Sequence, residues 1–153
     1  MAPDTLIIEA SHADERMLRA MQSLLAQLSP QAPELTLEAL EEITTTPTTR
    51  LLLAVSNTTE EEIVGALTLA IFRIPSGIRA WIEDVVVAPE SRGQGTGSAL
   101  VTAAIDTAQA EGARTVDLTS RPAREEANRL YRKLGFEQRT TNVYRYTIRD
   151  SIL

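Results

Sequence analysis

VVVAPESRGQGTGSAL, residues 85–100, joins an apolar strand pattern to a glycine-rich turn and then to the start of a helix. Gly93, Gly95 and Gly97 alternate with polar residues in the turn. The first N–H groups of a helix have no helical acceptor and lie at its positive end, so they attract anions. Glycines let a phosphate approach the backbone closely, and Arg92 adds a charged donor. The segment therefore predicts a phosphate-binding turn.

Two common phosphate-binding fingerprints do not fit this turn. A dinucleotide site requires G-x-G-x-x-G, but Ser98 stands at the third glycine position after Gly93 and Gly95. A P-loop requires Lys and then Ser or Thr after its last glycine, whereas Gly97 is followed by Ser98 and Ala99. A nucleotide-binding oxidoreductase is therefore disfavoured, and titration with NADH tests that alternative.

The residues before the turn predict helices followed by an antiparallel meander. Ser11 and Asp14 have the spacing of a capping box ahead of an amphipathic helix. Apolar runs separated by polar or Pro-Gly turns predict consecutive strands. We expect a strand at residues 5–8, helices at 13–28 and 35–43, and strands at 51–55, 63–74 and 78–87.

The residues after the turn predict a crossover and a final strand pair. A helix that ends at Gly112 connects the strand at 78–87 to one at 116–118, so those two strands should be parallel. Another helix should begin near Pro122 and end before Gly135. Residues 136 and 143–148 suggest a last antiparallel pair. The whole pattern predicts an α/β fold with a mixed, mostly antiparallel sheet, in a single domain over residues 1–153.

Composition excludes several chemistries. The sequence contains no cysteine, which excludes disulfides, a thiol nucleophile and thiolate metal sites. His12 is the only histidine, so neither a multi-histidine metal site nor a later triad histidine exists, and we expect no metal. No apolar run of membrane-spanning length and no signal-peptide pattern occurs, so we expect no membrane partner and a cytoplasmic location.

Charge is divided unevenly along the chain. Residues 1–62 hold eleven acidic residues and three arginines, for −8, whereas residues 63–153 hold ten acidic and twelve basic residues, for +2. The acidic balance disfavours nucleic-acid binding, which depends on neutralising phosphates. The division suggests an anionic ligand for the second half and a cationic one for the first, although a solvated acidic surface is the simpler explanation of the first half.

The turn and a later segment together resemble a known family. Residues 92–97, RGQGTG, are similar to the coenzyme A pyrophosphate signature of the GNAT superfamily of N-acetyltransferases, Arg/Gln-x-x-Gly-x-Gly/Ala. Residues 127–136, ANRLYRKLGF, resemble the family's later helix with its Leu-Tyr-x-x-x-Gly-Phe ending. The resemblance covers nearly the whole chain and implies a sheet with one splayed parallel strand pair, flanked by about four helices. It also implies acetyl-CoA as co-substrate.

The resemblance implies a set of cofactor-binding residues. The pantetheine arm would lie between the splayed strands against the backbone of residues 85–87, and the amides of residues 93–98 would hold the pyrophosphate. Asn128 would be a polar contact from the later helix. Arg124 stands where many members of the family carry an asparagine, so the role of Arg124 stays open. The full set is Val85, Val86, Val87, Arg92, Gly93, Gln94, Gly95, Thr96, Gly97, Ser98, Asn128 and Tyr131.

Acetyl transfer to an amine requires a base and an acid. Glu83 is the base that the resemblance favours, often through water, with neighbouring Asp84 as the alternative; on a regular strand the two would face opposite ways. Tyr131 is the acid, because a phenol stays protonated at neutral pH and can donate to the departing thiolate. Glu83 could instead be an ion-pair partner and Tyr131 a core residue. Trp81 could line the acceptor pocket or pack in the core.

The sequence thus predicts an acyltransferase that moves an acetyl group directly to an amine of a small molecule or peptide. The acidic first half would suit a cationic acceptor, since the first helices usually wall the acceptor pocket in this family. An acyl-CoA-binding sensor or accessory protein without catalysis is the alternative. Homodimers are common in the family, but no segment here specifies one.

Overall fold

The computed structural model describes residues 5–58 and 60–149. The described chain forms two compact units, which divide between Thr119 and Ser120. The first unit contains the sheet and three α-helices, and the second contains one helix. Whether both units make one domain stays a prediction.

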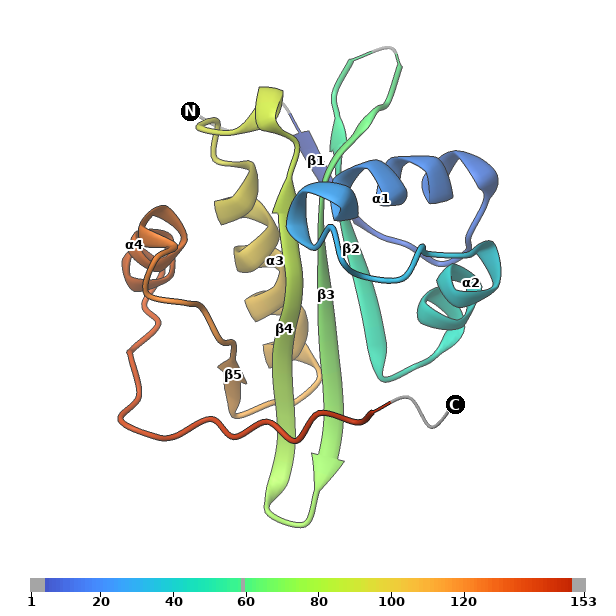
Figure 1. Cartoon of the computed structure of the whole chain (residues 1–153). Helices are drawn as coiled ribbons and strands as arrows, with labels where there is room; N and C mark the ends of the chain where they lie inside the picture. Colours follow the sequence, from blue (N-terminus) through green and yellow to red (C-terminus); the bar gives the residue numbers. More distant parts are fainter. Residues whose placement is uncertain (1–4, 59, 150–153) are drawn as a thin grey trace. The chain divides into compact units, whose positions relative to one another are not determined.

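The sheet of the first unit has the strand order β1-β2-β3-β4-β5 (Figure 1). Its strands are β1 (Thr5–Glu9), β2 (Thr49–Ser56), β3 (Ile63–Ile74), β4 (Gly77–Val87) and β5 (Thr115–Asp117). The first three pairings are antiparallel, and β4 pairs with β5 in parallel. The predicted meander and the parallel pair are therefore confirmed.

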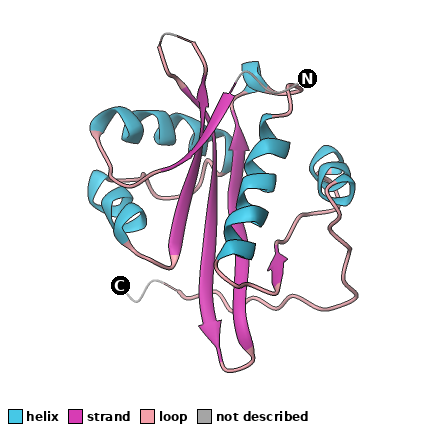
Figure 2. Cartoon of the chain, turned by 180° about the vertical axis from the view of Figure 1, so that it is seen from behind, coloured by secondary structure: helices cyan, strands magenta, loops and turns pink. Residues whose placement is uncertain are grey.

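Helices cover both faces of this sheet. On one face lie α1 (Glu15–Leu28) and α2 (Leu37–Thr45), and α3 (Thr96–Ala110) covers the other face, as the reverse view shows (Figure 2). α3 belongs to the crossover that makes β4 and β5 parallel. Its buried face contains Leu100, Val101, Ala104 and Ala108, which recur at helical spacing.

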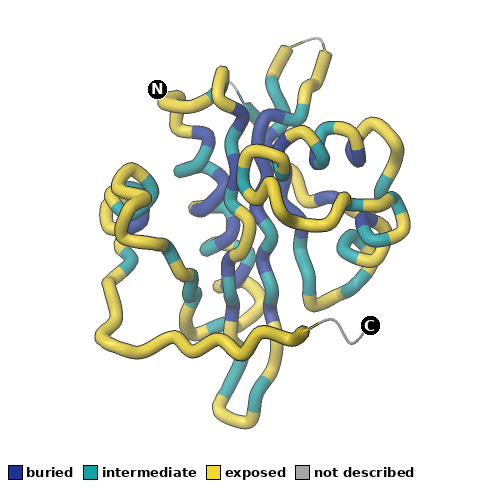
Figure 3. Tube along the Cα trace, in the orientation of Figure 1, coloured by how far each residue is buried: buried dark blue, intermediate teal, exposed yellow. Residues whose placement is uncertain are grey.

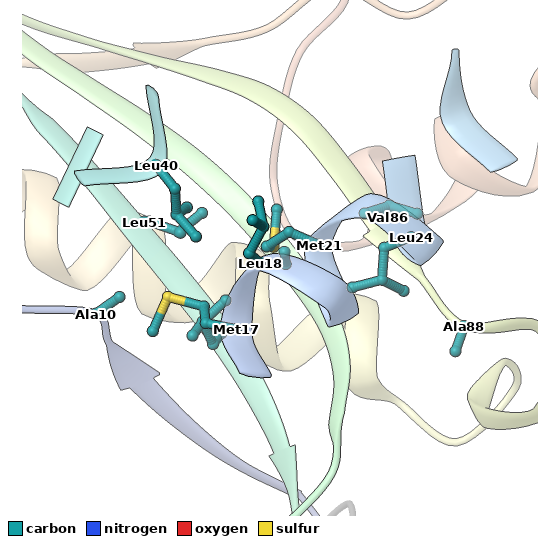
Figure 4. Close-up of a cluster of buried hydrophobic side chains, with 11 residues drawn as sticks. Ala10, Met17, Leu18, Met21, Leu24, Leu40, Leu51, Val86 and Ala88 are labelled. Carbon is teal, nitrogen blue, oxygen red and sulfur yellow. The ribbon is translucent and has the colours of Figure 1, made fainter. Parts of the chain in front are cut away.

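A core of apolar side chains lies between α1, α2 and the sheet. Met17, Leu18, Met21 and Leu24 extend from α1 toward residues of the central strands (Figure 4). Leu51 and Val86 belong to the same cluster, and buried positions follow the three central strands (Figure 3). This core fixes the end of β4, where the glycine-rich turn begins.

The first helix starts later than its sequence pattern indicates. Asp14, and not Ser11, is the cap: its Oδ1 accepts a hydrogen bond from the Met17 N–H at 2.8 Å. A carboxylate directly before the first turn accepts an unpaired helical N–H and also favours the positive helix end. The expected capping box was therefore wrong by one turn, although the helix itself was correct.

The second unit contains α4 (Glu125–Lys133) and a long irregular segment. α4 begins after Arg124, three residues beyond Pro122, so the expected start at that proline was wrong. The expected final strand pair is also absent, because residues 136–149 contain no strand. Val143, Tyr144, Tyr146 and Ile148 are between 73% and 89% exposed there, although their pattern favours a strand.

Candidate active site

The last part of β4 has one open edge. β4 pairs with β5 only through Arg79, Ala80 and Trp81, while β4 itself continues to Val87. The Ala88 N–H donates to the Val64 carbonyl on β3 at 2.8 Å. Peptide groups alternate in direction along a strand, so those of Val85 and Val87 point away from β3 toward the open edge. An extended ligand that contains amide groups can form hydrogen bonds with these two peptide groups.

A β-bulge interrupts β4 just before this edge. Thr68 pairs with Glu83 and Ala66 pairs with Val86, so two residues of β4, Asp84 and Val85, oppose the single residue between Ala66 and Thr68. Asp84 has φ +50°, in the left-handed region that few residues other than glycine, asparagine and aspartate adopt. The strand is therefore irregular at Asp84, and the orientation of Glu83 and Asp84 to opposite sides stays a prediction.

The bulge sets which side chains share a face. Glu83 lies on the same face of the sheet as Val86, whose side chain belongs to the core beneath α1, although a regular strand would separate two residues three positions apart. Glu83 and Asp84 are both exposed. Although the Asp84 residue is exposed, partial burial of its carboxyl group, reinforced by the negative charge of Glu83, raises the pKa of Asp84 above its ordinary value.

Glu83 is held by a neighbouring indole. The Trp81 Nε1–H donates to Glu83 Oε1 at 2.7 Å. Trp81 and Glu83 are two positions apart on one strand, so both side chains project from the same face. The sequence pattern did not predict this hydrogen bond.

The turn after β4 has the backbone that its glycines predict. A 3-10 helix, η1 (Pro89–Ser91), leads from β4 into the turn. Gly93 has φ +75° and Gly95 has φ +82°, which an L side chain rarely adopts. A Cβ at either position would meet no heavy atom within 4 Å, so the space beside both glycines is open.

The N-terminus of α3 presents unpaired donors. Its first helical bond runs from the Ala99 N–H to the Gly95 carbonyl at 2.9 Å, so the N–H groups of residues 96–98 have no helical acceptor. Gly95 provides no side-chain cap. The hydroxyl of Thr96, a residue only 2% exposed, also has no hydrogen-bond partner within the described chain. The three free N–H groups suit an anion with several oxygens, such as the pyrophosphate of acetyl-CoA.

Arg92 lies between this turn and α1. Its Nε–H donates to the Val87 carbonyl at 3.2 Å, and its Nη2 donates to Gln27 Oε1 at 3.3 Å. Arg92 therefore contacts the open edge of β4, and Gln27 is a neighbour that sequence reasoning missed. Gln94 Nε2 donates to the Glu90 carbonyl at 3.4 Å.

In the second unit, α4 carries the remaining predicted residues. Asn128 Nδ2 donates to the Arg121 carbonyl at 3.0 Å, which ties the helix to the segment before it. Tyr131 is buried, and its ring packs edge-on against Phe136 with centroids 5.7 Å apart. Burial raises the pKa of the Tyr131 phenol, and the positive charge of Arg124 partly opposes that rise. The phenol therefore stays protonated at neutral pH.

Other features lie away from the predicted residues. An open depression in the first unit is lined by His12, Ala13 and residues of α2, three of them glutamates, and includes no predicted site residue.

Across residues 5–58 and 60–149, no group of three His, Cys, Asp or Glu side chains could hold a metal ion. No helix in that same part of the chain is long and apolar enough to cross a membrane.

Comparison with protein families gives a direct assignment. The model of the acetyltransferase (GNAT) family matches residues 17–136, from the first turns of α1 to the residue after Gly135. The chain belongs to the GNAT acetyltransferase family. It is therefore an acyltransferase, and the resemblance inferred from residues 92–97 and 127–136 is confirmed.

Solved structures show the same GNAT fold. A transcriptional regulator from Bacillus halodurans C-125 is 29% identical, with a TM-score of 0.80 and coverage of 94% of this chain and 99% of that chain. A Trypanosoma brucei acetyltransferase is 25% identical, with a TM-score of 0.78 and coverage of 94% and 100%. The aminoglycoside N-acetyltransferase AAC(6')-Iy, solved with CoA, is 20% identical, with a TM-score of 0.77 and coverage of 98% of both chains. A search of curated proteins gave no match.

Proposed function

We propose that this GNAT protein transfers the acetyl group of acetyl-CoA directly to an amine of a small molecule or peptide. The observation that carries the proposal is the α3 N-terminus, where the unpaired N–H groups of residues 96–98 follow the open edge of β4. The CoA complex of AAC(6')-Iy supports the same co-substrate for this fold. We propose no metal, and a cytoplasmic location.

The residues of the first unit bind the co-substrate in this proposal. The peptide groups of Val85 and Val87 bond the pantetheine arm, and Val86 anchors the strand in the core beneath α1. The amides from Gly93 to Ser98 hold the pyrophosphate. Arg92 leaves the Val87 carbonyl to the arm and turns its guanidinium toward the phosphates. When bound, acetyl-CoA supplies an activated acetyl thioester.

Glu83 and Tyr131 perform the proton transfers. Glu83 takes a proton from the attacking amine, directly or through one water, as the amine nitrogen bonds the acetyl carbon. Tyr131 gives its phenol proton to the sulfur as the carbon–sulfur bond breaks; its raised pKa keeps that proton available. Asn128 adds a polar contact to the co-substrate. The absence of cysteine from the sequence agrees with direct attack.

The proposed acceptor is cationic. Residues 1–62 carry a net charge of −8 and include α1 and α2. AAC(6')-Iy, an aminoglycoside N-acetyltransferase of the same fold, gives a precedent for a polycationic amine. Sisomicin, spermidine and a peptide with a free N-terminus therefore form a suitable first panel.

Thiol release in the presence of acetyl-CoA tests this function. Wild-type protein should release CoA only when an amine of the panel is present. Glu83→Gln should lower turnover by about 100-fold, in the range of general base catalysis. Glu62→Gln, an exposed glutamate in a loop before β3, is the matched control and should keep wild-type turnover. Acetyl-CoA binding without turnover of any amine would instead favour a sensor.

A further inference from the structure

Trp81 is at the last position where β4 is paired on both edges. Its partners are Ala70 on β3 and Asp117 on β5, the final pair of the parallel ladder. Beyond it, β4 keeps only the β3 ladder and then enters the bulge at Asp84. Trp81 therefore lies in the most constrained part of β4, whereas Glu83 lies where that constraint ends.

The contact between the two side chains is directional. A nitrogen–oxygen distance of 2.7 Å is at the short end of the range for N–H···O bonds and is typical of a charged acceptor. An indole N–H can only donate, so it bonds a lone pair of the carboxylate. One hydrogen bond occupies part of Oε1 and leaves Oε2 available to a proton from an amine or a water.

An exposed glutamate without such a bond has considerable rotamer freedom. Glu83 is exposed and contacts no cation through an ion pair in the described chain. Trp81 is half-buried, so its ring is a fixed point from which the N–H can hold the carboxylate. Geometric misplacement of a catalytic group by about 1 Å can lower a rate by roughly 100-fold.

We propose that Trp81 is a positioning residue for Glu83: its indole N–H fixes the carboxylate in the orientation in which it receives the proton of the acceptor amine. This role rests on the proposed function of Glu83 as the base. The role does not involve the acetyl-CoA site, because Trp81 acts only through Glu83. Its loss should therefore lower kcat and spare the KM for acetyl-CoA.

The pair can be observed without turnover. The sequence contains one tryptophan, so a ¹⁵N-labelled sample gives a single indole N–H signal. Replacing Glu83 by glutamine exchanges a charged acceptor for a neutral one, which should move that signal and speed its exchange with water. Glu62→Gln should leave the signal in place. An indole signal that does not respond to Glu83→Gln overturns the proposal.

Kinetics then test the role itself. Trp81→Phe keeps an aromatic ring but removes the donor, and we expect kcat to fall by about 10-fold or more with the KM for acetyl-CoA within about two-fold. Phe72→Leu alters an exposed aromatic residue on the same face of the sheet and should leave both constants unchanged.

The possible results separate this proposal from the general function. A folded Trp81→Phe protein with wild-type kcat overturns the positioning role, and a Trp81→Phe protein that does not fold assigns the ring to the core instead. If no amine of the panel is acetylated, the proposed function fails and the positioning role fails with it, while the indole signal still reports whether the contact exists.

Discussion

At the scale of single residues, the site is built on an unusual backbone position. Asp84 adopts a positive φ within a strand, which costs about 1–2 kcal/mol for most L residues. The resulting bulge aligns Glu83 with the face of Val86 and precedes the open edge of β4. Strained positions of this kind occur preferentially at functional sites. Nothing in the local sequence required the bulge, although aspartate tolerates this conformation better than most residues.

Asp84→Asn should change how stability depends on pH. Because the folded protein raises the pKa of Asp84, it binds that proton more tightly than the unfolded chain. The associated stability is complete at low pH and is lost as pH rises through the folded pKa. Asparagine also tolerates a positive φ but does not titrate. Urea unfolding from about pH 3 to about pH 8 should therefore show the variant gaining stability relative to wild type as pH rises. A difference independent of pH contradicts this account.

Thr96→Val tests the orphaned hydroxyl at the start of α3. Valine has nearly the same shape, and removing a buried hydroxyl without a partner should stabilise the ligand-free protein by about 1 kcal/mol. The same change should leave acetyl-CoA binding unchanged, because the hydroxyl is buried and the backbone amides are proposed to hold the phosphates. Thermal unfolding and calorimetric titration measure the two effects. A destabilised variant would show that the hydroxyl already has a partner in the free protein, and a weakened affinity would show that it contacts the ligand.

At the scale of elements, the packing of α3 against the sheet determines the direction of the helix and thus where its N-terminus lies. Gly65 on β3 allows the close approach: an added Cβ would lie 3.2 Å from Leu100 Cδ1 and 3.2 Å from the Val86 carbonyl oxygen. The Val86 carbonyl belongs to the backbone of β4, so it cannot move away as easily as the end of a flexible side chain can.

Gly65→Ala should therefore destabilise the protein by about 1–3 kcal/mol, the range for overpacked cores. It should also weaken acetyl-CoA binding, since it displaces the backbone of Val86 or the first turns of α3. Urea midpoints and titration calorimetry provide the readouts. Wild-type stability together with wild-type affinity would contradict the close contact.

The sequence predicted elements well where periodicity and turn chemistry agreed. The meander, the crossover and the glycine turn at Gly93 and Gly95 all follow from local patterns. The failures have physical reasons. Residues 143–148 have strand-forming side chains, but a strand needs a partner edge that propensity cannot provide. The bulge at Asp84 and the hydrogen bond from Trp81 depend on pairing register, which a sequence pattern does not specify.

At the scale of the whole molecule, the two parts of the sequence have net charges opposite to those of the two proposed ligands. The first 62 residues carry −8 and the remainder +2, in keeping with a cationic acceptor and an anionic co-substrate. Salt screens such attraction, with a Debye length near 10 Å at about 0.1 M. The KM for spermidine should therefore rise several-fold between about 0.05 and 0.5 M NaCl. An unchanged KM would mean that the acidic half is only a solvated surface.

In the proposed function, the turn from Arg92 to Ser98 binds acetyl-CoA. Isothermal titration of the purified protein with acetyl-CoA, with free CoA and NADH in parallel, tests it most directly. We expect saturable binding of one acetyl-CoA per chain, binding of free CoA, and no binding of NADH. Absence of binding to both CoA forms would contradict the assignment of the α3 N-terminus as the co-substrate site.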